Sequence, residues 1–197
     1  MLEQNIEDKN SNGVNKQIII TVLFLVLILG GLFAIKSFVP KKQIEDFNYN
    51  HMKLQSSVFE NGGYIPPKYT CDGINSNPSL QISDAPIGTK SLVLTLSDPD
   101  APSGDFVHWL MWNITPETKL IKMDDLPKEF VQGKTDFGKN EYGGPCPPSG
   151  VHHYIFKLYA IDFVFDPMSP NTDKTKILTL IKDHILAKVE LVGLYER

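Results

Sequence analysis

The stretch at residues 92–114 reads LVLTLSDPDAPSGDFVHWLMWNI. It begins and ends with an apolar run, and the segment between the runs is rich in Asp, Pro, Ser and Gly, which favour turns. The two runs, 92–96 and 108–114, are therefore predicted to be strands joined by a loop. The two-residue period of a strand predicts that four residues of the second run share one face: His108, Leu110, Trp112 and Ile114.

Polar residues gather where the first run ends and the second begins. Asp98 and Asp100 directly follow the first run, and Pro99 and Pro102 restrict the backbone beside them, so the two carboxylates are held in a turn. His108 then starts the second run. Each aspartate alone is also typical of an ordinary turn, and the histidine alone is typical of a strand end, so these simpler interpretations stay open.

A second segment, YGGPCPPSGVHHY at residues 142–154, has a similar composition. Its glycines permit a close backbone approach to a ligand, and its three prolines stiffen the loop. The strand predicted at 152–161 follows, with His152 and Tyr154 on one face and His153 on the other. Two loops that each lead into a strand through a histidine predict a single site. Tyr154 alone is also typical of a core residue.

The rest of the region from residue 54 onward is mainly β in pattern. Its apolar segments are short and are separated by Gly, Pro, Asn and Asp. One helix is predicted at 173–187, capped by Asn171 or Thr172, because apolar residues recur there at helical spacing. The segment VELVGLY at 189–195 is predicted to be the last strand.

The N-terminal region contains an uncharged and nearly all apolar segment, residues 18–35. At a rise of about 1.5 Å per residue it just spans a hydrocarbon core of roughly 30 Å. We predict an uncleaved single-pass transmembrane anchor, preceded by a tail at 1–17 and followed by a lysine-rich linker at 36–53 and a domain at 54–197. A cleaved signal peptide and a buried core helix are the alternatives, but no small-x-small cleavage site follows the segment.

The orientation of this anchor depends on few charges. Two lysines precede the segment and three follow it: Lys9 and Lys16, then Lys36, Lys41 and Lys42. The positive-inside tendency favours a cytoplasmic domain by that small margin. A short tail followed by a signal-like segment typically exports what comes after it, and we therefore predict an extracytoplasmic domain.

The composition restricts the partners and the redox chemistry. The formal net charge of -4, without a long basic run, argues against binding of nucleic acid. Cys71 and Cys146 are the two cysteines, and they pair in an oxidising compartment or stay as buried thiols in a reducing one. The sequence leaves both states open.

Together these motifs resemble the phosphatidylethanolamine-binding protein (PEBP) family, and within it the bacterial and archaeal Raf kinase inhibitor-like branch, YbhB/YbcL. The resemblance covers residue 54 to the C-terminus and is carried by four segments: SDPDAP…HWLMWNI, GPCPPSGVHHYIFKLYAID, YTCDGINSNPSL and ILAKVELVGLYER. It implies an antiparallel β-sandwich with Greek-key connections and a few peripheral helices. It also implies a small pocket for phosphate-like anions, formed by Asp98, Asp100, His108, Gly144, His152 and Tyr154.

Two positions depart from the family pattern. His153 stands where the family usually has arginine, and Gln81 and Ile82 follow PSL where an aromatic residue is common. His153 is predicted to face away from Tyr154, so the change should affect the support of the pocket more than the pocket itself.

The leading interpretation is a membrane-tethered, non-catalytic domain that binds a small anionic or phosphorylated ligand, for instance a phospholipid head group, with a regulatory or inhibitory role and without a cofactor or resident metal. A hydrolase or metalloenzyme that uses the two Asp and two His is an alternative, although HExxH, GxSxG and Cys₂His₂ patterns are absent from the sequence. A third is inhibition of a macromolecular partner through exposed loops. The sequence identifies neither the ligand nor a protein partner.

Overall fold

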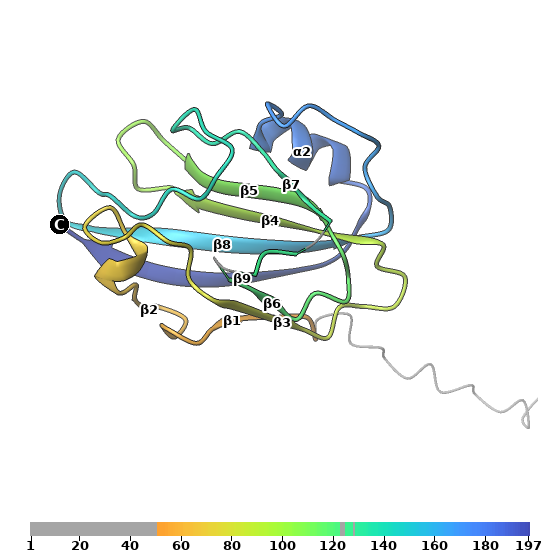
Figure 1. The fold of residues 1–197 in the computed structure, drawn as a ribbon, viewed down its shortest axis with the longest axis horizontal. Coiled ribbons are helices and arrows are strands. Elements are labelled where there is room, and N and C mark those ends of the chain that lie inside the picture. The colour runs from red at the N-terminus through yellow and green to blue at the C-terminus, as the bar shows by residue number, and fades with distance from the viewer. Residues whose placement is uncertain (1–50, 123–124, 128) are drawn as a thin grey trace, which may run out of the picture. The chain divides into compact units, whose positions relative to one another are not determined.

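The computed structural model describes residues 51–122, 125–127 and 129–197, and in these the chain forms two β-sheets and one α-helix (Figure 1). The larger sheet has six strands in the order β2-β9-β8-β4-β5-β7. They are β2 (Gly63–Tyr64), β9 (Ile185–Glu196), β8 (Val151–Ile161), β4 (Ser91–Asp98), β5 (Phe106–Ile114) and β7 (Val131–Gln132). The smaller sheet has the order β1-β3-β6, formed by β1 (Lys53–Ser56), β3 (Leu80–Ser83) and β6 (Leu120–Ile121).

The strand order in the larger sheet is that of a Greek key, except that β6, which lies between β5 and β7 in the chain, belongs to the smaller sheet. β4, β5 and β7 are neighbours in the larger sheet, and β8 returns to pair with β4, the first of the three. All strand pairs are antiparallel except β2 with β9, which pair in parallel. The mainly β sandwich with few helices is therefore confirmed, with one parallel pair at the edge as an exception.

The larger sheet is covered on both faces, which explains why every residue of β4 is buried. Leu92, Leu94 and Leu96 point toward the smaller sheet and pack there against residues such as Leu80 and Ile121. Val93 points to the opposite face, where the helix α2 (Lys174–Ile181) buries Ile177 and Ile181. The core therefore consists of two apolar clusters, one on each side of the larger sheet. Figure 1 shows the smaller sheet and α2 on opposite sides of the larger sheet.

Strand β5 contains two bulges, and they overturn the predicted face of its side chains. Leu96 is opposite Trp109 but Ser97 is opposite Val107, so His108 is an extra residue in the strand. A second register shift lies between Leu92 and Leu94 of β4. Facing that shift, Asn113 has a φ of 57°, in the left-handed region that asparagine tolerates.

These bulges redistribute the residues that a regular strand would align. Leu110 and Trp112 pack in the cluster beneath α2, whereas Ile114 packs in the cluster beneath the smaller sheet. The His108 ring lies against the Tyr154 ring, with centroids 5.2 Å apart, and Tyr154 belongs to the cluster beneath the smaller sheet. The predicted face of His108, Leu110, Trp112 and Ile114 is therefore wrong, because an extra residue in a strand reverses the alternation that follows it.

The predicted helix at 173–187 is shorter than expected. α2 ends at Ile181, and β9 begins at Ile185, because Ile185 and Ala187 pair with the end of β8. The cap is Asp173, whose side chain accepts a hydrogen bond from the Lys176 N–H at 2.8 Å, and not Asn171 or Thr172. The apolar spacing continued past Ile181 because the outer residues of a half-buried strand can mimic a helical pattern over one turn.

The predicted tail, anchor and most of the linker, residues 1–50, lie outside the described residues. Within residues 51–122, 125–127 and 129–197, no helix is long and apolar enough to cross a membrane.

Candidate ligand-binding site

The candidate site lies at the end of the larger sheet where β4 ends and β5 and β8 begin. The β4–β5 loop and the segment at 133–150 meet at this end, which is on the left in Figure 1, near the C-terminus. A disulfide between Cys71 and Cys146, with Cα atoms 5.5 Å apart, ties the second segment to the loop that follows the short helix η1 (Pro67–Tyr69). Of the two states left open by the sequence, the structure has the paired one.

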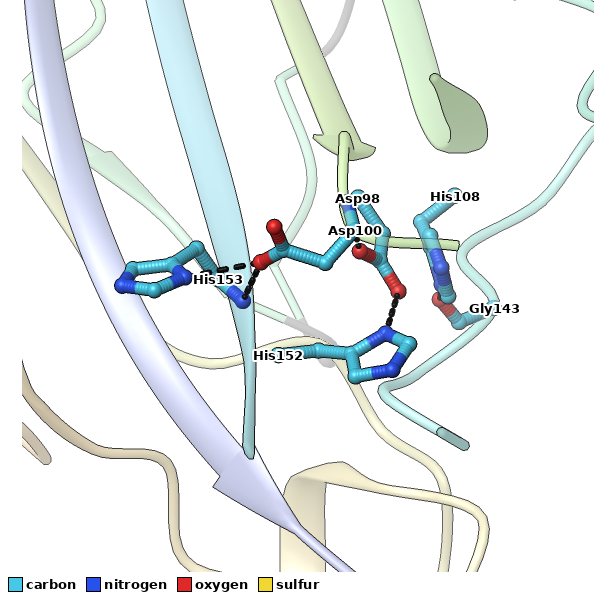
Figure 2. Close-up of polar contacts among 6 residues, drawn as sticks. All are labelled: Asp98, Asp100, His108, Gly143, His152 and His153. Atoms are coloured by element: carbon cyan, nitrogen blue, oxygen red, sulfur yellow. Dashed lines mark hydrogen bonds and ion pairs between the residues drawn. The ribbon is translucent and has the colours of Figure 1, made fainter. Parts of the chain in front are cut away.

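Asp98 and His152 form a buried pair at the centre of the site (Figure 2). The Nδ1 of His152 lies 2.8 Å from Oδ2 of Asp98, and the two residues are 7% and 3% exposed. The other carboxylate oxygen, Oδ1, accepts the backbone N–H of Asp100 at 2.9 Å. Both oxygens of Asp98 are therefore used within the protein, and the carboxylate orients the imidazole.

His108 is held by the chain segment that faces it. Its Nδ1 donates to the carbonyl oxygen of Gly143 at 2.8 Å, and the Gly143 N–H donates to the carbonyl oxygen of His108 at 2.9 Å. Burial lowers the pKa of His108, while the carbonyl groups of Gly143 and Gly144 and the charge of Asp98 oppose that effect. The same chain segment also holds the residue before His108, because Oδ2 of Asp136 accepts the Val107 N–H at 2.7 Å.

Asp98, His108 and His152 line one cavity of about 190 Å³. Most of the remaining wall is apolar or proline: Pro102, Phe106, Phe137, Pro147 and Pro148. The cavity is therefore large enough for a small group such as a phosphate and its first substituent atoms. Its polar side chains are the two imidazoles, one carboxylate and the Ser103 hydroxyl.

Asp100 does not line this cavity, contrary to the expected grouping. Its Oδ2 accepts the backbone N–H of His153 at 2.8 Å and lies 2.7 Å from the His153 Nδ1 (Figure 2). The hydrogen bonds from His153 lower the pKa of Asp100. The prediction that His153 faces away from Tyr154 is confirmed, since the His153 side chain is about half exposed. His153 thus supports the loop through Asp100.

Gly144 also lies outside the 190 Å³ cavity. It lines a neighbouring cavity of about 240 Å³, and its N–H donates to Oδ1 of Asn75 at 2.8 Å. Phe137 and Cys146 line both cavities and separate them. The backbone donor expected from Gly144 for a bound anion is therefore already used inside the protein.

Tyr154 lies behind His108 and is fully buried. Its hydroxyl makes no hydrogen bond of good geometry in the described part of the chain, although the Asp98 carboxylate and the Cys146 backbone lie near it, and burial raises its pKa. The phenol is therefore neutral. An unpartnered buried hydroxyl costs roughly 1–3 kcal/mol.

Replacing Tyr154 by phenylalanine tests this description. Tyr154→Phe should raise the free energy of unfolding by about 1 kcal/mol, because it removes a buried hydroxyl that gains no bond on folding. Denaturant unfolding of the full chain measures the change. The matched control is Tyr142→Phe, which should instead lower the free energy of unfolding by about 1 kcal/mol, since the Tyr142 hydroxyl donates to the Tyr69 carbonyl at 2.7 Å. Equal losses in the two variants would show that the Tyr154 hydroxyl is hydrogen-bonded in solution.

Sequence reasoning missed the apolar wall of the cavity. Phe106 and Phe137 pack edge-to-face with centroids 4.9 Å apart, and each ring contacts the His108 ring. Phe137 lies in a segment with no strand or helix pattern, so no local signal indicated it. Phe106, two residues before His108, falls on the same face of β5 by simple alternation and was predictable in principle.

The two Asp and two His of the motifs leave a metal site open as an alternative. In the part of the chain that the structure describes, no group of three or more His, Cys, Asp or Glu side chains is arranged to hold a metal ion.

Comparisons with known proteins agree with this fold. Residues 55–196 match the family described as phosphatidylethanolamine-binding protein. The UPF0098 protein PH1269 of Pyrococcus horikoshii is 45% identical over 150 residues, which cover 72% of this chain and 75% of that protein. A UPF0098 protein of Methanothermobacter thermautotrophicus is 43% identical over 151 residues, which cover 74% of this chain and 99% of that protein.

Two solved structures are similar along the same region. The PEBP homolog CT736 of Chlamydia trachomatis superimposes with a TM-score of 0.71 at 37% identity, covering 75% of this chain and 99% of that one. E. coli YbcL, described as a member of the mammalian PEBP family, superimposes with a TM-score of 0.69 at 31% identity, covering 74% of this chain and 98% of that one. The chain therefore belongs to the phosphatidylethanolamine-binding protein family.

Proposed function

We propose that this domain binds a small phosphorylated or otherwise anionic ligand without catalysis, and that residues 18–35 tether it to a membrane, with the domain on the extracytoplasmic side. The observation that carries the binding proposal is the pair of oriented, buried histidines on one small cavity, His108 and His152. Imidazolium N–H groups are suitable donors for phosphoryl oxygens. The tether is tested by sequencing the N-terminus of membrane-extracted protein, and a start beyond residue 35 would favour a cleaved signal peptide.

The sign of the pH dependence follows from the histidines. A cationic imidazole has two N–H donors and a positive charge, whereas a neutral one has a single donor. Because burial lowers the pKa of His108, its ring becomes cationic only below the usual histidine range. Positive charge in the cavity therefore decreases as pH rises, and anion binding should weaken with it.

A titration with inorganic phosphate measures this dependence. The full chain should bind phosphate more tightly at about pH 5.5 than at about pH 8. His152→Ala should lose at least about tenfold in affinity at the lower pH, because a charge-assisted hydrogen bond contributes about 1.5–3 kcal/mol. His184→Ala is the matched control, since the His184 Nδ1 also lies 2.8 Å from a carboxylate, that of Asp162, but outside the cavity.

Three outcomes separate the proposal from its alternatives. Unchanged binding in His152→Ala, or binding that strengthens with pH, would mean that the histidines do not hold the anion. Release of product from a phosphate ester, lost in His152→Ala, would favour the hydrolase. A lack of any anion binding would favour a role for the exposed loops in contacting a macromolecular partner.

A further inference from the structure

We propose that the cavity binds phosphate monoesters in preference to phosphate diesters. This inference deepens the proposed function and depends on it. It follows from which ring nitrogens of His108 and His152 carry hydrogen, and from the absence of a permanent cation in the described wall of the cavity.

The hydrogen of neutral His108 is located by its partner. The Nδ1 atom lies 2.8 Å from the Gly143 carbonyl oxygen, and a carbonyl oxygen only accepts hydrogen bonds. Nδ1 therefore carries the hydrogen. In the neutral ring Nε2 is then an acceptor with a lone pair.

His152 is fixed in the same way by a different acceptor. Its Nδ1 lies 2.8 Å from Oδ2 of Asp98, and the other oxygen of that carboxylate already accepts the Asp100 N–H. An ionised carboxylate only accepts, so Nδ1 is again the donor. Figure 2 shows the second ring nitrogen of His152 on the side of the ring away from Asp98. With both rings neutral, the cavity thus presents two imidazole acceptors.

Apart from the two histidines, the described wall of the cavity has one side-chain donor, the Ser103 hydroxyl. No lysine or arginine lines the described wall of the cavity, and the prolines in that wall have no N–H. The titratable groups that face the two rings are acidic or neutral: Asp98 and Asp100 from the end of β4, Asp136 from the following segment, Tyr154 from β8, and Tyr195 opposite His152 on β9. Cys146 is in the disulfide and does not titrate. A dianion therefore meets two imidazole acceptors and a carboxylate, with the Ser103 hydroxyl as the one other side-chain donor in the described wall.

A phosphate monoester resolves this mismatch because it can carry its own hydrogen. Its second ionisation lies at about pH 6, so a monoanion with one P–OH group is available near neutral pH. The P–OH hydrogen is donated to Nε2, or it moves to that nitrogen and leaves a dianion beside an imidazolium, and the proton count of the complex is the same in both cases. A diester has no such hydrogen. It can form a hydrogen bond to Nε2 only after that nitrogen has bound a proton from solvent.

The test compares monomethyl phosphate with dimethyl phosphate, which differ by one methyl group. At about pH 6, where the monoester is partly protonated, calorimetric titration of the full chain should show at least about tenfold tighter binding of the monoester. At about pH 7.5, where the monoester is mainly a dianion, titrations in buffers of different ionisation enthalpy should show uptake of close to one proton per bound monoester. Phosphatidylcholine vesicles that contain either phosphatidic acid or phosphatidylethanolamine extend the comparison to lipids, since the first is a monoester and the second a diester.

Two variants locate the effect. His152→Gln replaces the oriented acceptor by an amide that also donates, so the preference should shrink to less than about threefold. His184→Gln, which alters a carboxylate-paired histidine outside the cavity, should keep the full preference. If His152→Gln does not fold, the wild-type comparison decides alone. Equal affinity for the two methyl esters, or monoester binding without proton uptake, overturns the inference while the proposed function stands. No binding of either ester overturns both.

Discussion

Removal of the Cys71–Cys146 disulfide should lower the free energy of unfolding by about 4 kcal/mol. The bond joins residues 75 apart in sequence, and cross-linking a loop of that length restricts the unfolded chain strongly. The bond also holds the segment that carries Gly143 and the cavity residues Cys146, Pro147 and Pro148. The double variant Cys71→Ala/Cys146→Ala should therefore lose phosphate affinity as well as stability.

Denaturant unfolding of the full chain, with and without reducing agent, measures this loss. The wild type in reducing agent should approach the stability of the double variant, and the double variant itself should not respond to the reducing agent. A loss below about 1 kcal/mol would show that contacts across the two joined loops already restrict the unfolded chain.

The second large effect is expected at Gly144. A Cβ atom at this position would lie 2.4 Å from Oδ1 of Asn75, 2.5 Å from the carbonyl oxygen of Tyr69 and 2.9 Å from Cα of Thr70. Two of these atoms are backbone, so the loop after η1 has to move. Gly144→Ala should lower the free energy of unfolding by about 3 kcal/mol, at the upper end of ordinary overpacking.

The matched control for this substitution is Gly138→Ala. No atom lies within 4 Å of a Cβ at Gly138, whose φ is +76°, so only the left-handed backbone should cost stability there, by about 1 kcal/mol. Thermal or denaturant unfolding compares the two variants. A Gly144→Ala variant no less stable than Gly138→Ala would mean that the two loops approach less closely in solution.

The parts of this fold that depend on local pattern were predictable from the sequence. The apolar run before Asp98 and the run that carries His152 and Tyr154 form the paired strands β4 and β8, and the buried face of β8 follows the two-residue alternation over most of its length. The motifs also indicated which residues meet: Asp98, His108 and His152 line one cavity. Their role in ligand binding stays a prediction.

The remaining features depend on contacts distant in sequence. The bulge at His108 exists because β5 pairs with β4 on either side of it and because Gly143 binds His108 through both its N–H and its carbonyl oxygen. Alternation alone therefore assigned the wrong neighbours to the ring. Asp100 lies outside the cavity because its carboxylate accepts the backbone N–H of His153. A backbone donor of this kind cannot be predicted from a side-chain motif. Phe137 closes the cavity from a segment without regular structure.

The edges of the larger sheet affect how copies of this protein behave when they are crowded together. An outer strand with open N–H and C=O groups is a template for a foreign strand and thus for aggregation. Here the outermost strands β2 and β7 have only two residues each. Where β2 leaves β9 uncovered, that strand carries Lys188 and Glu190, which form an ion pair at 2.7 Å. Short and charged edge strands of this kind leave little length along which a strand of a second chain could pair. They should therefore favour colloidal stability at high protein concentration.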